Sequence, residues 1–122
     1  MQKRVLVIED EPNISEAIRF ILTRNGWQVE VEADGMAALS RLRTAPPDAL
    51  ILDLMLPDMD GFEVLRSLRA EGPTRELPVL MLTARGQNAD RDLAARLGVT
   101  RFMTKPFANA DVIAALQDMV AP

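Results

Sequence analysis

Several short apolar segments of this 122-residue chain are followed at once by side chains that could do chemistry. Glu9 and Asp10 come directly after one apolar run, and Asp53 comes directly after another. Thr83 ends a third run, and Lys105 follows a shorter one near the carboxyl end. Carboxylates, a hydroxyl and an ammonium group together suit a hard divalent cation and a phosphoryl group. The sequence therefore indicates metal-assisted phosphoryl chemistry, provided that the fold brings these segments together.

Composition excludes several other kinds of chemistry. The chain has no cysteine and no histidine, which rules out disulfides, thiolate or imidazole metal ligands and histidine-activated nucleophiles. Fourteen Lys and Arg residues against 18 Asp and Glu residues give a formal net charge of −4, which argues against direct binding to nucleic acid or an anionic membrane. Since the sequence has no apolar run long enough for a signal peptide or a membrane span, we expect a cytoplasmic protein.

Five segments have the apolar pattern of β-strands. Residues 5–8, 49–52 and 79–82 are continuous apolar runs, which is typical of central strands that are covered on both faces. Residues 29–31 alternate between apolar and polar side chains, and the run at 101–103 is short. We therefore expect a five-stranded sheet in which these last two strands lie nearer the edges.

Segments with the apolar spacing of helices alternate with the strands. The first spans residues 14–22, where apolar residues recur at i, i+4, i+7 and i+8, and Asn25-Gly26 then favours a helix end. The other apolar stripes are Met36, Leu39 and Leu42; Phe62, Leu65 and Leu68; Ala89, Leu93 and Leu97; and Val112, Ile113, Leu116 and Met119. Five consecutive βα units predict an α/β fold, a doubly wound parallel sheet between two layers of helices, as one domain over residues 1–122.

The candidate residues should meet at one edge of this sheet, because ligands of such folds bind beyond the carboxyl ends of the strands. There Glu9, Asp10 and Asp53 would repel one another, and Mg²⁺ would offset that repulsion. Asp53 ends the most apolar central strand, so we expect it to be the deepest of the acids and the nucleophile that forms an aspartyl phosphate. Lys105 would neutralise part of the charge, and Thr83 could donate its hydroxyl to a phosphate oxygen.

Each of these residues also has a simpler explanation when it is taken alone. Acidic residues after strands are often solvated or cap helices, and we assign Glu11 to that class. A lysine before proline, such as Lys105, is usually a surface residue, and a threonine at a strand end, such as Thr83, is usually structural. Their joint occurrence on one edge favours the phosphoryl site.

Four motifs lie in the order and spacing of one protein family. They are Val-Leu-Val-Ile-Glu-Asp-Glu at 5–11, Asp-Leu-Met-Leu-Pro-Asp-Met-Asp-Gly at 53–61, Leu-Thr-Ala at 82–84 and Lys-Pro-Phe at 105–107. On these motifs the chain resembles, over essentially its whole length, the receiver domain of two-component response regulators. The resemblance implies a flavodoxin-like (βα)5 fold with strand order 2-1-3-4-5 and a cis peptide bond before Pro106.

The resemblance also implies a function. Asp53 would accept a phosphoryl group from a phosphohistidine on a sensor histidine kinase or a histidine phosphotransfer protein. The implied Mg²⁺ ligands are Glu9, Asp10, Asp53 and the backbone carbonyl of Met55. Thr83 would then move toward the phosphate and Phe102 would turn inward, which reshapes the face formed by the fourth helix, fifth strand and fifth helix. Such a domain is a signalling domain rather than an enzyme, and at most catalyses its own phosphotransfer and dephosphorylation.

Partner contacts are implied by the same resemblance. Ile14, Ala17 and Pro106 resemble the family's kinase-docking patch, although core packing explains Ile14 equally well. By family position, Met55 and Arg85 flank the approach of the water that hydrolyses the phosphoryl group.

Two departures from the family pattern bear on output. Thr100-Arg101 and Ala115 replace the acids and the arginine that relatives fused to winged-helix domains use in dimers, so a monomer and a phosphorylation-dependent dimer both stay open. Ala108 and Asn109 replace the usual small polar residue and proline before the last helix, which weakens that cap unless Asn109 takes its place. The downstream effector is not identified by the sequence.

Other functions fit the residues less well. A flavin-binding module needs a Ser/Thr/Gly-rich loop after the first strand, where residues 9–12 would instead repel a phosphate. The P-loop motif is absent from the sequence. An aspartyl-phosphate hydrolase would want a second acid at the position of Met55. The remaining alternative is a receiver-fold interaction module or phosphate sink whose output does not depend on phosphorylation.

Overall fold

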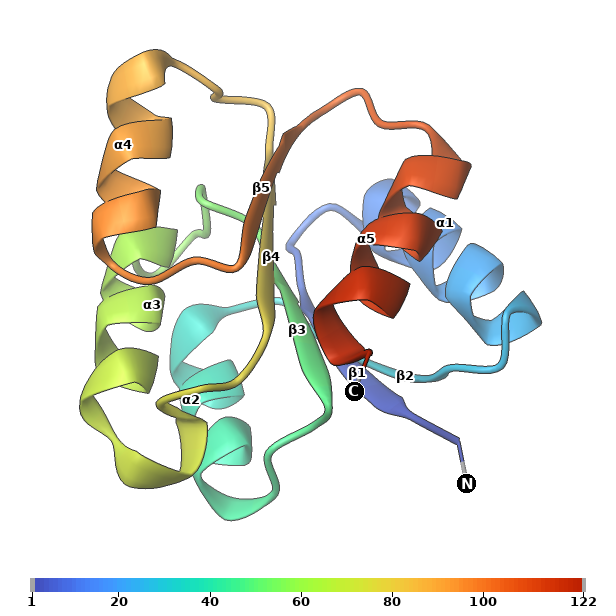
Figure 1. Ribbon diagram of the computed structural model, residues 1–122, viewed down its shortest axis with the longest axis horizontal. Helices are drawn as coiled ribbons and strands as arrows, with labels where there is room; N and C mark the ends of the chain where they lie inside the picture. Colours follow the sequence, from blue (N-terminus) through green and yellow to red (C-terminus); the bar gives the residue numbers. More distant parts are fainter. Residues whose placement is uncertain (1, 122) are drawn as a thin grey trace.

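A five-stranded parallel sheet lies between two layers of helices in the computed structural model, which describes residues 2–121 (Figure 1). In chain order the elements are β1 (Arg4–Ile8), α1 (Pro12–Arg24), β2 (Gln28–Glu32), α2 (Gly35–Thr44), β3 (Ala49–Leu52), α3 (Gly61–Ala70), the 3₁₀ helix η1 (Gly72–Thr74), β4 (Val79–Thr83), α4 (Asn88–Arg96), β5 (Arg101–Thr104) and α5 (Asn109–Val120). Met1 and Pro122, the ends of the predicted domain, lie outside the described residues.

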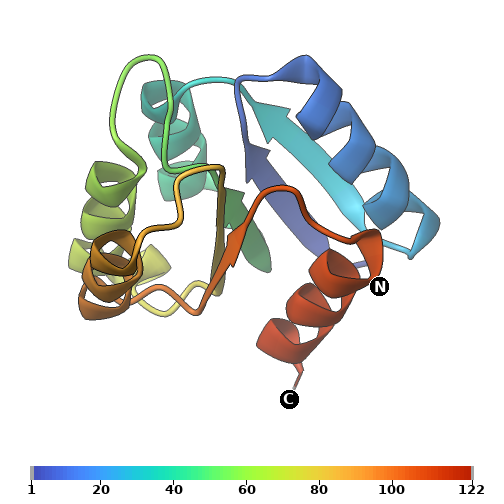
Figure 2. The same ribbon diagram turned by 90° about the horizontal axis from the view of Figure 1, so that it is seen from above.

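The strand order is β2-β1-β3-β4-β5, which confirms the predicted flavodoxin-like fold. The register places Val7 between Val31 on β2 and Ile51 on β3. After β1 the chain adds β2 on one side and then β3 on the other, so the order reverses between β1 and β3 (Figures 1 and 2). The two strands that we expected nearer the edges, β2 and β5, are the edge strands.

Alternate side chains of the central strands supply two hydrophobic cores. Side chains such as Leu6, Leu50 and Met81 face α2, α3 and α4, and their neighbours Val7, Ile51 and Leu80 face α1 and α5. All six are at most 1% exposed. Both faces of the sheet are thus covered, as the continuous apolar runs of these strands indicate. The layer of α2, α3 and α4 and the layer of α1 and α5 stand on opposite sides of the sheet in Figure 1.

Two positions of the predicted helical stripes are wrong. Met36 is 65% exposed, and the buried side of α2 is formed by other residues, including Leu39 and Leu42. Ala89 is also exposed, because Asp90 and not Ala89 takes the buried position at the start of α4. The apolar pattern alone does not reveal a buried aspartate that is neutralised by a partner elsewhere.

The helix end predicted at Asn25-Gly26 is confirmed, and a second glycine, Gly98, ends α4 in the same way. Gly26 and Gly98 follow α1 and α4 with φ values of 89° and 93°, a conformation that glycine adopts without strain. The bond between Lys105 and Pro106 is cis, as the resemblance implied. Among the described side chains none caps the amino end of α5, so Asn109 does not replace the cap missing at Ala108. Within residues 2–121 no helix combines the length and hydrophobicity needed to cross a bilayer.

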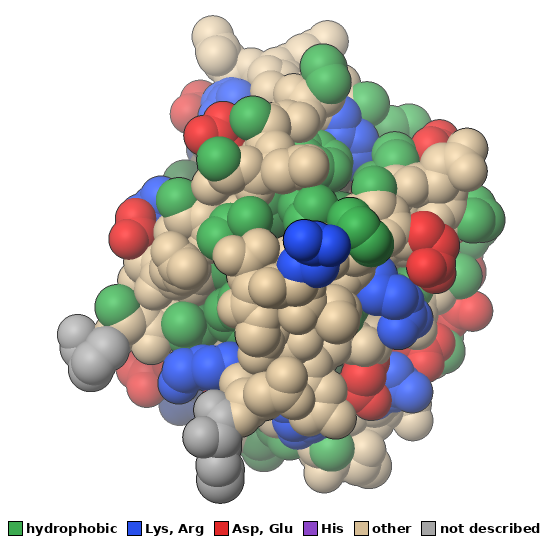
Figure 3. Space-filling model, turned by 90° about the vertical axis from the view of Figure 1, so that its right-hand side faces the viewer, with side chains coloured by type: hydrophobic (Ala, Val, Ile, Leu, Met, Phe, Trp, Pro, Cys, Tyr) green, Lys and Arg blue, Asp and Glu red, His purple; other side chains and the backbone are tan. Residues whose placement is uncertain are grey.

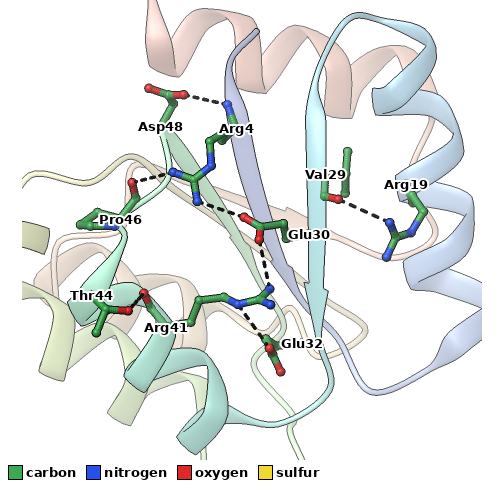
Figure 4. A network of polar contacts seen from close by, with 9 residues as sticks. All are labelled: Arg4, Arg19, Val29, Glu30, Glu32, Arg41, Thr44, Pro46 and Asp48. Carbon is green, nitrogen blue, oxygen red and sulfur yellow. Dashed lines mark hydrogen bonds and ion pairs between the residues drawn. The ribbon is translucent and has the colours of Figure 1, made fainter.

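A network of charged side chains, here called the charged network, joins β1, β2 and α2 (Figure 4). Arg4 pairs with Glu30 at 3.0 Å, and Arg41 reaches both Glu30 at 3.6 Å and Glu32 at 3.5 Å. The backbone N–H of Arg4 donates a 2.7 Å hydrogen bond to Asp48 before β3. Each glutamate of the charged network therefore has an arginine partner.

Candidate functional site

The candidate residues lie together at the carboxyl edge of the sheet. Backbone pairing extends beyond the strands here: the N–H of Asp53 donates to the Ile8 carbonyl at 3.0 Å, and the N–H of Lys105 donates to the Thr83 carbonyl at 2.8 Å. These bonds align the ends of β1 with β3 and of β4 with β5. Parallel pairing thus brings together side chains that are far apart in the sequence, at the reversal of strand order.

Glu9, Asp10 and Asp53 form an acidic cluster whose ligand oxygens all lie within 4.8 Å of one another. Glu9 is 4% exposed and Asp53 is 6% exposed, whereas Asp10 is exposed to solvent. Our expectation that Asp53 is the deepest acid is therefore wrong, because Glu9 is buried at least as well. Glu9 follows β1, which has a neighbouring strand on each side, and its carboxylate is bonded to Lys105.

Lys105 is the cation bonded to this cluster among the residues that the structure describes. Its Nζ lies 2.6 Å from Glu9 Oε1 and 3.4 Å from Asp53 Oδ2. Burial raises the pKa of Glu9 to about 7, against the lowering effect of the Lys105 hydrogen bond and with a further rise from the Asp53 charge. Burial lowers the pKa of Lys105, but its bonds to Glu9 and the Asp53 charge outweigh this effect and raise it overall. The three carboxylates of the cluster thus face a single positive charge, that of Lys105.

The chemistry of the donors fits a hard divalent cation. Three carboxylates offer oxygen ligands, and such ions bind oxygen and tolerate partial hydration. An open cavity of about 320 Å³ adjoins the cluster and is lined by Asp10, Glu11, Asp53, Met55, Ala84 and Lys105. Met55 lies beside Asp53, and its N–H donates to Asp53 Oδ1 at 3.2 Å. The acidic cluster and this cavity, which we call the acidic pocket, could hold both a metal ion and a phosphoryl group.

Thr83 ends β4 at the carboxyl edge of the sheet, and Phe102 lies on β5 beside α4. The Thr83 side chain is fully buried, and its hydroxyl accepts a 3.1 Å hydrogen bond from the Arg85 backbone N–H. The Arg85 side chain turns away to pair with Asp90 through two contacts of 3.1 and 3.2 Å, which explains the burial of Asp90. Phe102 is half-buried, and the Arg91 guanidinium lies 4.8 Å from the centre of its ring. The structure thus links both predicted switch residues to the start of α4.

The three predicted docking residues differ in their exposure. Ala17 and Pro106 are exposed, while Ile14 is half-buried and packs on the core beneath α1 and α5. The α1 and α5 side of the molecule presents hydrophobic side chains near its centre with a basic side chain among them, and acidic side chains lie toward its margins (Figure 3). Ile14 therefore contributes to packing, as the alternative explanation predicted, and retains some exposed surface.

Asp58 is a polar residue of this region that sequence reasoning did not single out. Its Oδ1 accepts a 2.8 Å hydrogen bond from the Gly35 N–H, and its Oδ2 accepts one of 3.0 Å from the Met36 N–H. These bonds lower the pKa of Asp58 below its usual value. A pattern within the loop could not reveal this contact, because the partner amides begin a helix that is distant in the sequence.

Comparison with known proteins agrees with the fold and with the pocket. A family model described as the response regulator receiver domain matches residues 5–117. The phosphate regulon transcriptional regulatory protein PhoB of Escherichia coli is 38% identical over 117 residues, which are 96% of this chain and 51% of PhoB. The response regulator MprA of Mycobacterium bovis is 38% identical over 120 residues, which are 98% of this chain and 51% of MprA. The chain thus spans about half the length of these two relatives.

A solved structure is similar along the whole chain. The receiver domain of the sensor histidine kinase PA1611 from Pseudomonas aeruginosa is 30% identical, with a TM-score of 0.92 and full coverage of both chains. That structure is described as having a magnesium ion coordinated in its active site cleft. The fold and the acidic pocket thus define a signalling domain of the α/β class. The chain belongs to the response regulator receiver domain family of two-component signal transduction.

Proposed function

We propose that Asp53 is the phosphoacceptor of this receiver domain and takes its phosphoryl group from a phosphohistidine. One observation carries the choice between the two buried carboxylates. Asp53 lines the 320 Å³ cavity, whereas Glu9 is absent from its lining and lies closer to Lys105, at 2.6 Å against 3.4 Å for Asp53. An approaching phosphoryl group therefore meets an oxygen of Asp53 first.

We propose Mg²⁺ as the cofactor, held by Glu9, Asp10, Asp53 and the backbone carbonyl of Met55. The oxygen-only donor set and the surplus of negative charge support this assignment. The magnesium ion named in the PA1611 receiver structure supports it as well. When bound, Mg²⁺ would neutralise charge on the phosphoryl oxygens.

Three residues of this chain have different roles in the proposed phosphoryl transfer. An oxygen of Asp53 forms a bond to phosphorus while the phosphorus–nitrogen bond of the donor breaks, and the imidazole leaves with the electron pair of that bond. Lys105, within 3.4 Å of Asp53, is placed to pair with a phosphoryl oxygen. The Thr83 hydroxyl accepts from the Arg85 N–H, so its own hydrogen stays available to a phosphate oxygen.

The proposed switch uses Thr83 and Phe102. A shift of the Thr83 hydroxyl toward the phosphate would weaken its bond to the Arg85 N–H and alter the segment before α4. Phe102, which contacts Arg91 of α4, would then turn inward and reshape the face of α4, β5 and α5. On that face Arg101 already pairs with Asp118 within the chain at 3.2 Å. Whether phosphorylation also produces a dimer is decided by measuring the mass of the phosphorylated protein in solution.

The proposed partner is a sensor histidine kinase or a histidine phosphotransfer protein that docks at Ile14, Ala17 and Pro106. These side chains lie on α1 and directly after Lys105, beside the acidic pocket. We propose that residues 1–122 form one receiver domain in the cytoplasm, with signalling and not turnover of a substrate as its role. Its own catalysis would be limited to phosphotransfer and dephosphorylation.

Intact-mass measurement tests this function directly. The protein is incubated with a small acyl-phosphate donor, with and without Mg²⁺, alongside the Asp53→Asn variant. Asp48→Asn, which makes the same change at the residue before β3, is the matched control. A single phosphoryl adduct that needs both Mg²⁺ and Asp53, and that the control retains, is the expected result. Mg²⁺ binding without any adduct would instead favour an interaction module whose output does not depend on phosphorylation.

A further inference from the structure

The loop between β3 and α3 is closed at its stem by backbone contacts. The Gly61 N–H donates a 2.7 Å hydrogen bond to the Leu54 carbonyl, and Met55 forms an isolated antiparallel bridge with Asp60. A Cβ at Gly61 would lie 2.6 Å from the Asp53 carbonyl oxygen, so the two backbones are in direct contact here. The carboxyl end of the loop thus lies against the backbone of Asp53, the residue of the acidic pocket at which the loop begins.

The tip of this loop is tied to the first turn of α2 by Asp58. Its two carboxylate oxygens accept from Gly35 and Met36, whose N–H groups have no partner within the helix. Asp34 caps the same turn independently, since its side chain accepts from the Ala37 N–H at 2.8 Å. One helix end therefore has two aspartate acceptors, of which Asp58 alone belongs to the loop.

Met59 gives the loop tip a second contact with α2, of a different kind. A Cβ at Gly35 would lie 2.6 Å from Met59 Sδ, so glycine lets this side chain lie close against the helix. Met59 is half-buried and packs on the core beneath α2 and α3. Apolar packing of this kind holds the tip near α2 but has little directionality. The paired hydrogen bonds of Asp58 are the contact that sets the orientation of the tip.

We propose that Asp58 is a positioning residue for the phosphoacceptor site, because its bonds to α2 keep the backbone around Met55 in the conformation that binds the metal. The inference rests on the proposed function, which assigns the Met55 carbonyl to Mg²⁺. With both stem and tip fixed, that carbonyl is held before the ion arrives. With the tip released, ion binding must also order the loop, and the affinity falls.

The charge of Asp58 and its hydrogen bonds can be separated by paired variants. Asp58→Ala removes both the charge and the acceptor oxygens, while Asp58→Asn removes the charge and keeps one acceptor. Asp34→Ala and Asp34→Asn make the same changes at the same helix end without touching the loop. Asp34→Ala also loses the side-chain cap of α2, so it controls for stability, whereas Asp34→Asn keeps an acceptor and controls for charge.

Mg²⁺ titration followed by amide NMR is the test, at fixed ionic strength on the 122-residue chain. We expect Asp58→Ala to bind Mg²⁺ about tenfold more weakly and Asp58→Asn about threefold more weakly than the wild type. Both Asp34 variants should keep the wild-type affinity for Mg²⁺, even though the melting temperature of Asp34→Ala falls. The amide resonances of Gly35 and Met36 should shift on Mg²⁺ binding in the wild type and stay unchanged in Asp58→Ala.

Several results would overturn the inference. Wild-type affinity for Mg²⁺ in Asp58→Ala would do so. Equal losses of Mg²⁺ affinity in the Asp58 and Asp34 variants would also do so, because they would show an effect of stability alone. Equal losses of Mg²⁺ affinity in Asp58→Asn and Asp58→Ala would assign the effect to the charge of Asp58 and not to its hydrogen bonds. If Asp58→Ala does not fold, the Asp58→Asn and Asp34→Asn pair decides by the same criterion. A wild type that binds no Mg²⁺ would overturn the proposed function itself, and this inference with it.

Discussion

The acidic pocket and the charged network are both clusters of carboxylates and cations, but their internal balance differs. In the charged network two glutamates, Glu30 and Glu32, face two arginines, and these side chains are 24–39% exposed. In the acidic pocket three carboxylates meet one lysine. The side chains of Glu9, Asp53 and Lys105 are only 3%, 7% and 13% exposed.

The difference indicates how a functional cluster can be told from a structural one. Paired surface charges contribute little to stability, and they need no further partner. Crowded, nearly buried carboxylates raise the free energy of the folded state until a cation arrives, so their presence requires another explanation. The proposed binding of a divalent ion and a phosphoryl group would supply that explanation for the acidic pocket. The experiments below compare equivalent changes in the two clusters.

Removal of the central cation should produce the largest contrast. In metal-free protein we expect Lys105→Met to lower the free energy of unfolding by about 3 kcal/mol, because it leaves nearly buried carboxylates uncompensated. Arg41→Met in the charged network should cost less than about 1 kcal/mol, since water screens the glutamates that it leaves. Urea denaturation of both variants measures the difference. Equal losses would show that the two clusters are energetically alike.

Mg²⁺ should stabilise the protein through the acidic pocket and not through the charged network. At a hundredfold excess over its Kd, an ion that binds only the folded state adds about 2.7 kcal/mol, which thermal denaturation detects as a higher melting temperature. Glu30→Gln, as the control, should keep this gain, because Glu30 belongs to the charged network. An unchanged wild-type melting curve at saturating Mg²⁺ would count against a metal site.

The fold was largely predictable from the sequence, because each central strand carries its own signature. The run at 49–52 matches β3, three other strands are longer than predicted by one residue at one end, and β2 is longer by one residue at each end. Asp90 was missed because its burial depends on Arg85, and apolar periodicity contains no information on such pairing. The sequence predicted the chemical types at the carboxyl edge, since parallel strands place their ends together.

The details of the site were less predictable, because they depend on neighbours in space. Glu9 is as buried as Asp53 because Lys105 reaches back to it from β5, a contact across 96 positions of the chain. Asp58 belongs to a quoted motif, yet its partners on α2 are 22 and 23 positions away. Sequence reasoning identified which side chains lie at the carboxyl edge of the sheet, and the structure shows which of them form hydrogen bonds with which partners.

Neutralisation of one carboxylate should have opposite signs in the two clusters. Asp53→Asn relieves repulsion with Glu9 and Asp10, so we expect metal-free protein to gain about 1 kcal/mol in its free energy of unfolding. Glu32→Gln removes an ion pair with Arg41 and should lose up to about 0.5 kcal/mol. Both values come from urea denaturation in the presence of a chelator. A loss of stability in Asp53→Asn would indicate that Asp53 has a structural role instead.

Asp58 represents a third arrangement, an exposed carboxylate whose partners are backbone amides of α2, and it should produce the smallest effect. Its pKa in the folded protein lies below the ordinary value of 3.8, because Gly35 and Met36 donate to the ionised form. Because the pKa of Asp58 is lowered by folding, its contribution to stability is complete above pH 3.8 and is lost as the pH falls through the pKa of the folded protein.

The melting temperature of the wild type should therefore exceed that of Asp58→Asn at pH 6, and the difference should shrink below pH 3.8. Thermal denaturation of the two proteins across this range measures it, and acid effects on other carboxylates cancel in the comparison. A difference that stays constant down to pH 2 would show that the carboxylate charge does not contribute to the bonds with α2.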